Sequence, residues 1–93
     1  MPFVLVDTVQ IDNVERARDA LHSDVIPGVK QAPGFVHGTW SANRENGRGI
    51  AFMVFGHRDE AEALMRIQLS GEMKFPRGVT LESATVYEVQ GEA

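Results

Sequence analysis

The sequence predicts an α+β fold whose elements follow one another as β-α-β-β-α-β. The main observation is the run from Gly49 to Gly56, which is apolar on both alternating sets of side chains and is therefore typical of a strand covered on both faces. Two segments with helical spacing of apolar residues and a hairpin signal at Asn46-Gly47 complete the pattern. A chain of 93 residues is expected to form one domain, residues 1–93.

The first strand is predicted over Phe3 to Ile11, where the side chains alternate between two faces. Its first half is apolar on both faces, as in a central strand. One face carries Phe3, Leu5, Asp7, Val9 and Ile11.

The first helix is predicted to begin after Asp12 or Asn13, either of which is a good N-cap residue. We expect a pause at Ile26, because Pro27 disfavours helical geometry in the residue before it, and then a short turn to Gln31. The apolar stripe of this helix comprises Val14, Ala17, Leu21, Val25 and Val29.

The second strand is predicted over Phe35 to Asn43. Asn46 and Gly47 then favour a tight primed turn in which both residues take positive φ, so that this strand pairs antiparallel with the Gly49–Gly56 run. One face of the second strand carries Phe35, His37, Thr39 and Ser41, and the other carries Val36, Gly38, Trp40 and Ala42.

The second helix is predicted to begin among acidic residues, which suit the N-terminal end of a helix dipole, and to end at Ser70-Gly71. Its expected buried side chains are Ala61, Leu64, Met65, Ile67 and Leu69. The last strand is predicted over Val79 to Val89.

This element order is that of the ferredoxin-like fold, in which both helices cover one face of an antiparallel sheet. The first and third strands then lie in the middle, in agreement with the two strands that are apolar on both faces. The other sheet face carries an apolar row that would be an aggregation hazard in a monomer. We therefore expect a two-fold homodimer whose sheets pack face to face into an α/β barrel.

The composition restricts the classes of partner. The net charge of -4 argues against nucleic acid and anionic membranes, because no cluster of Lys and Arg offsets the repulsion from phosphates. Cysteine is absent, which excludes disulfides and thiolate chemistry. The N-terminal segment has no basic region before a signal-length apolar run, and no run is long enough for a bilayer span, so we expect a cytoplasmic protein.

The stretch from Val25 to Val36 includes Pro33-Gly34-Phe35 at the start of the second strand, and it is followed by Trp40, the hairpin and Val54-Phe55 before an acidic helix start. In order and spacing, these features resemble the dimeric α/β-barrel superfamily that includes the antibiotic biosynthesis monooxygenases. The resemblance covers nearly the whole chain. It implies a dimer with a pocket between helices and sheet in each subunit, used in that superfamily for cofactor-free oxygenation, haem breakdown or isomerisation.

The same resemblance argues against haem breakdown. Haem-degrading members have an asparagine on the first strand where this chain has Asp7, a tryptophan near the place of Leu64, and a histidine ligand at the end of the second helix. Residues 70–75 contain no histidine that could bind iron. None of the three histidines has metal-ligand spacing to another, so we expect neither a metal site nor a cofactor.

Three residues are candidates for catalysis. Asp7 shares its face with apolar residues, so burial would raise its pKa toward that of a general base; alternatively, it lies near a solvated sheet edge or accepts a backbone hydrogen bond. His37 could transfer a proton or lie at the dimer seam. Tyr87 could donate a hydrogen bond to a ligand or have no function. The candidate substrate contacts are Thr39, Trp40, His22 and Phe55, with packing as the alternative role of Trp40.

The leading hypothesis is a small homodimeric protein that binds an apolar or aromatic metabolite and acts as a cofactor-independent monooxygenase, since a deprotonated substrate can itself pass an electron to oxygen in a dry cavity. The alternative is a non-catalytic binding or accessory protein on the same scaffold. A third hypothesis arises because residues 48–55 resemble the RNP1 octamer of RNA-recognition motifs. Ile50 in place of an aromatic residue and the acidic charge argue against binding of single-stranded RNA.

Overall fold

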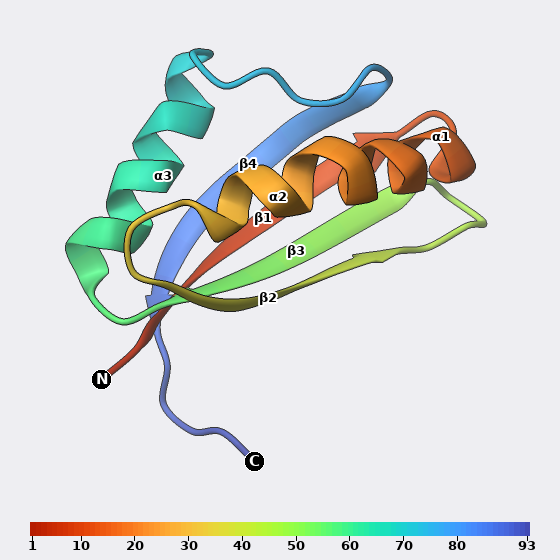
Figure 1. Cartoon of the computed structure of the whole chain (residues 1–93). Helices are drawn as coiled ribbons and strands as arrows, with labels where there is room; N and C mark the ends of the chain where they lie inside the picture. Colours follow the sequence, from red (N-terminus) through yellow and green to blue (C-terminus); the bar gives the residue numbers. More distant parts are fainter.

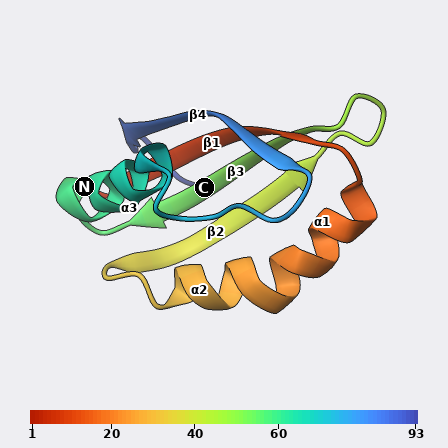
Figure 2. The same cartoon turned by 90° about the horizontal axis from the view of Figure 1, so that it is seen from above.

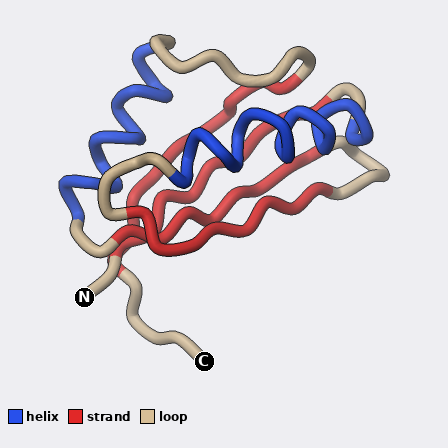
Figure 3. Tube along the Cα trace, viewed as in Figure 1, coloured by secondary structure: helices blue, strands red, loops and turns tan.

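The computed structural model describes residues 1–93 and confirms the ferredoxin-like fold, with the helices on one face of a four-stranded antiparallel sheet (Figure 1; Figure 3). The strands lie in the order β2-β3-β1-β4, so that β1 and β3 are central as predicted. The elements are β1 (Phe3–Ile11), α1 (Val14–Ala20), a π-helical segment (Leu21–Val25), α2 (Ile26–Lys30), β2 (Phe35–Ala42), β3 (Arg48–Phe55), α3 (Arg58–Ser70) and β4 (Val79–Glu88).

The strand register assigns the side chains to two faces of the sheet. On β1, Leu5 lies opposite Met53 of β3, and Asp7 lies opposite Ala51, with these side chains toward the helices. We call this side the helix face and the other side the open face. The open face carries Val4, Val6, His37, Thr39, Ile50, Phe52, Val54 and Tyr87.

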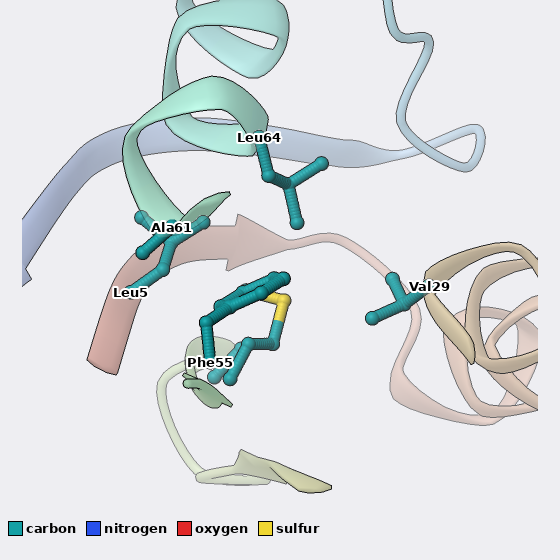
Figure 4. Close-up of a cluster of buried hydrophobic side chains, with 7 residues drawn as sticks. Leu5, Val29, Phe55, Ala61 and Leu64 are labelled. Atoms are coloured by element: carbon teal, nitrogen blue, oxygen red, sulfur yellow. The ribbon is translucent and has the colours of Figure 1, made fainter. Parts of the chain in front are cut away.

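The hydrophobic core lies between the helix face and the helices (Figure 4). Leu5, Met53 and Phe55 are its largest fully buried side chains, and Phe55 packs edge to face against Phe35 with 5.9 Å between ring centroids. The cluster comprises Leu5, Val29, Ala51, Met53, Phe55, Ala61 and Leu64.

The first helical region begins as predicted but does not pause at Ile26. The Asn13 side chain caps α1 by accepting a hydrogen bond from the Arg16 backbone N–H. Ile26 is helical, and its N–H bonds to the Leu21 carbonyl five residues earlier. This wider π-helical turn leaves room for the Pro27 ring, which would otherwise clash with the preceding turn of an α-helix. The predicted pause is therefore wrong.

The start of β2 also differs from the predicted alternation. The pairing with β3 shifts register between Phe35 and His37, so the sheet has an irregularity at this point. Phe35 consequently packs against the core on the helix face, whereas His37 and Thr39 lie on the open face. The prediction that Phe35 and His37 share a face is wrong, because a bulge re-aims one side chain relative to the next.

The hairpin between β2 and β3 is confirmed, but its turn is not a primed one. Gly47 has a φ of 73°, whereas Asn46 does not take positive φ. The Gly47 N–H bonds to the Asn43 carbonyl, and the Asn43 side chain accepts hydrogen bonds from the backbone of Glu45 and Asn46. This side-chain bonding stabilises a longer loop than a two-residue turn.

On α3, one polar residue is buried where apolar residues were expected. Ile67 and Leu69 are exposed, whereas Gln68 is 6% exposed. Gln68 stands seven residues after Ala61 and four after Leu64, so the helical repeat places it on their face. Gly71, with a φ of 83°, ends the helix as predicted.

The open face leaves large apolar side chains accessible to solvent. Phe52 is 42% exposed, and Ile50 and Tyr87 are also exposed. The chain after β4 runs on the side of the sheet away from the helices (Figure 1), where the Glu92 carboxylate lies 4.0 Å from a ring nitrogen of His37. None of the helices has the length and apolar character that a membrane span needs.

Candidate functional site

A cavity of about 420 Å³ lies between the helix face, the first helical region and the segment that leads to β4. In Figure 2, α1 and α2 run along the β2 side of the sheet, α3 lies apart from them, and the segment after α3 crosses between them. Twelve of the 18 lining residues are hydrophobic. The wall includes Val9, Ile11, Val14, Ala17, Leu21, Val25, Trp40, Ala51, Phe75 and Val79.

Asp7 is the acidic residue of the cavity wall, and it is only 3% exposed. Its position on β1 between Leu5 and Val9 places the carboxyl in an apolar layer. Burial raises the pKa of Asp7 from 3.8 to about 6, because the charged form loses its hydration, and the polar side chain of Gln68 offsets only part of this effect. The predicted burial and raised pKa are confirmed.

Gln68 of α3 is the buried polar neighbour of Asp7. One carboxyl oxygen of Asp7, Oδ1, and the amide oxygen of Gln68 have no hydrogen-bond partner within the protein. Buried polar atoms are nearly always paired, so a carboxyl with an unpaired buried oxygen in the wall of a cavity is an unusual group whose charged form the protein itself stabilises poorly. At neutral pH most of this carboxyl is ionised and able to take a proton.

The basic residues of the cavity lie at its solvent-exposed side. Arg18 and His22, from the first helical region, and Arg44, from the β2–β3 loop, line the cavity and are themselves exposed. Arg44 forms an ion pair with Glu15. No group of three or more His, Cys, Asp or Glu side chains is arranged to hold a metal ion.

The structure separates the three residues proposed for catalysis. Asp7 lines the cavity on the helix face, whereas His37 and Tyr87 lie on the open face with the sheet between them and the cavity. The sequence pattern placed each residue on a strand but did not fix which faces of strands far apart in the sequence coincide. Within one chain, His37 and Tyr87 therefore cannot act on a ligand that contacts Asp7.

Of the four predicted substrate contacts, some line the cavity and others do not. Trp40 and His22 line the cavity. Thr39 lies on the open face, and Phe55 is fully buried in the core rather than at the cavity wall. Phe55 is excluded from contact with a ligand because its ring is enclosed by Phe35 and the core cluster.

Gln68, Arg18 and Arg44 belong to the site but are not among the residues predicted from the sequence. Gln68 has a helical spacing from Ala61 and Leu64 that places it inside, whereas the prediction names Leu69 as buried. Arg18 lies one residue after the apolar stripe position Ala17, and only the structure shows that it reaches the cavity.

Replacing Asp7 by Asn is expected to stabilise the fold at neutral pH. Because the folded-state pKa lies above the unfolded one, this carboxyl favours the folded state fully only below about pH 3.8, and the contribution is lost as the pH rises through about 6. A pKa shift of this size corresponds to about 3 kcal/mol. We therefore expect Asp7→Asn to raise the free energy of unfolding by about 1–3 kcal/mol near neutral pH and by little at acidic pH.

Urea unfolding across this pH range measures the difference, with Asp19→Asn, the same change at an exposed site on α1, as the control. A loss of stability for Asp7→Asn at neutral pH would contradict the prediction.

Comparison with known proteins supports the fold. No protein-family model matches the chain, and no curated protein matches it. Several solved structures match the chain. One is a variant of SnoaB, described as a cofactor-independent oxygenase from Streptomyces nogalater, to which the chain is similar with a TM-score of 0.67. The sequence identity is 13%, and the alignment covers 98% of this chain and 95% of that one.

It is similar as well to the ActVA-Orf6 monooxygenase of Streptomyces coelicolor in complex with nanaomycin D, with 17% identity, coverage of 98% and 89%, and a TM-score of 0.60. A third similar structure is a dimeric ferredoxin-like protein from an uncultured marine organism, with 11% identity, coverage of 100% and 98%, and a TM-score of 0.62. At these identities the likeness concerns architecture: these structures and this chain share the ferredoxin-like fold.

Proposed function

We propose that the protein is a homodimeric, cofactor-independent monooxygenase that acts on a small apolar or aromatic metabolite. The observation that carries the proposal is the buried, partly unpaired carboxyl of Asp7 at the wall of a largely apolar cavity. A raised carboxyl pKa near 6 suits a general base that works near neutral pH.

In the proposed reaction, a phenolic hydroxyl of the substrate donates a hydrogen bond to the Asp7 carboxylate and then transfers its proton to it. The electron-rich anion passes one electron to molecular oxygen, and the resulting substrate radical and superoxide join through a new carbon–oxygen bond. Asp7 returns its proton to the peroxide anion that forms, and the resulting hydroperoxide loses water as its O–O bond breaks and the hydrogen on the same carbon leaves, which gives a carbonyl. One oxygen atom enters the product and the other leaves as water, so the protein supplies a base and a dry cavity.

Solved structures of the same fold support this chemistry. SnoaB is described as a cofactor-independent oxygenase, and ActVA-Orf6 is a monooxygenase that was crystallised with nanaomycin D. Both align with nearly the whole of this chain.

A non-catalytic binding protein is the second candidate function. The separation of His37 and Tyr87 from Asp7 favours it, because the buried part of the cavity then contains one proton-transfer group. The same apolar wall would bind a ligand without changing it.

Oxygen uptake distinguishes the two functions. With dihydroxynaphthalenes and larger fused-ring hydroquinones, we expect wild type to consume oxygen faster than the spontaneous reaction, with a protein-dependent rate that rises with pH through about 6 as Asp7 ionises. Asp7→Asn is expected to lower that rate by roughly a hundredfold or more, since it removes the base. Asp19→Asn is the matched control. Equal rates for wild type and Asp7→Asn would refute the role of Asp7, and no uptake by wild type would favour a binding protein.

We propose further that two copies pair through the open face. Phe52 and Ile50 are exposed there, and an exposed apolar patch marks an interaction surface. A second copy would cover the patch with an identical one. One structure of the same fold is described as dimeric.

Phe52→Glu is expected to dissociate this dimer, because pairing would bury two unpaired carboxylates against apolar side chains. Sedimentation velocity at micromolar concentration should give about twice the chain mass of 10.3 kDa for wild type and the chain mass for the variant. Leu69→Glu, which places the same charge at an exposed apolar site on α3, should remain dimeric. A monomeric wild type that shifts single-stranded RNA in low salt would instead support RNA binding by the open face.

A further inference from the structure

We propose that the ligand of the cavity is an aromatic compound with a carboxylate or similar anionic group at its solvent-facing end, and that Arg18 binds this group. The inference rests on the proposed use of the cavity as a ligand site and specifies the chemical class that it accepts. It makes Arg18 a residue that determines specificity.

The cavity is polarised between its buried wall and its mouth. Asp7, at 3% exposure, is the acidic residue of the wall, whereas Arg18, His22 and Arg44 are exposed and line the opening. The surface between them is mostly apolar. A ligand that fills the cavity therefore meets a hydrogen-bond acceptor at its inner end, apolar contacts along its body and positive charge at its outer end.

Charge pairing singles out Arg18 among the cations of this region. Arg44 is paired with Glu15, and Arg16 lies 3.5 Å from Asp12. Arg18 forms no ion pair with any acidic side chain of the chain. Its guanidinium is thus free to bind a carboxylate with two parallel N–H···O bonds.

The anionic group of the ligand must lie away from Asp7, which is at the buried end of the cavity. A carboxylate beside the ionised Asp7 would be repelled, and burial would leave both charges without hydration. A ligand with a hydroxyl beside Asp7 and a carboxylate beside Arg18 gives each of these two residues a matching group. A volume of about 420 Å³ lies within the range of small-molecule sites, so the cavity suits one ligand of fused-ring size.

Two probes with the same aromatic body test the inference: 6-hydroxy-2-naphthoate, which has a hydroxyl and a carboxylate at opposite ends, and its methyl ester. Calorimetry near neutral pH should show the carboxylate binding about tenfold more tightly than the ester, as a charge-assisted contact predicts. The indole N–H signal of Trp40, the single tryptophan and a cavity residue, gives an independent measure of occupancy.

Arg18→Gln should remove the preference for the carboxylate and leave the affinity for the ester unchanged. Arg18→Lys should restore part of the preference, because it keeps the charge but not the bidentate geometry. Arg16→Gln is the matched control, since Arg16 is on the same helix but does not line the cavity.

The outcomes separate this inference from the proposed function. If both probes bind wild type equally, or if Arg18→Gln keeps the preference, the role of Arg18 is refuted while the cavity remains a ligand site. If neither probe binds at millimolar concentration by heat or by the Trp40 signal, the cavity does not accept hydroxylated aromatic ligands, and the proposed function is refuted together with the inference.

Discussion

Both central strands of the sheet carry apolar side chains on both faces, and this constraint determines how the rest of the chain is arranged. The helices cover one face and bury Leu5, Met53 and Phe55 there, while Phe52 and its neighbours remain accessible on the other face. A chain of 93 residues has too few helices to cover both. The two faces are therefore suited to different roles, a cavity on the helix face and pairing on the open face.

The helix face includes one acidic side chain in its apolar layer. Asp7 is held there by the alternation of β1, because any residue at that position must point toward the helices. Its only buried polar neighbour, Gln68, does not satisfy all of its oxygens. A carboxyl in such a place destabilises the fold when it is ionised, and proteins commonly retain such groups where a function needs them.

The predicted features that the structure confirms are those that depend on local pattern. The alternation of Phe3 to Ile11, the cap at Asn13 and the stop at Gly71 each follow from a few adjacent residues. The wrong predictions concern small changes of register, such as the bulge after Phe35, and choices between neighbouring helix positions, such as Gln68 against Leu69.

The candidate site was harder to predict because it depends on which faces of β1, β2 and β4 coincide. Asp7 and Trp40 lie on the cavity side, whereas His37 and Tyr87 do not, and no local pattern relates the faces of strands that are far apart in the sequence. Asp7 lies in an apolar layer without hydration, so its carboxyl should titrate well above the ordinary range. Titration of its side-chain carbon signal by NMR measures this directly: we expect a midpoint near 6, and a midpoint near the ordinary 3.8 would show instead that the carboxyl is hydrated.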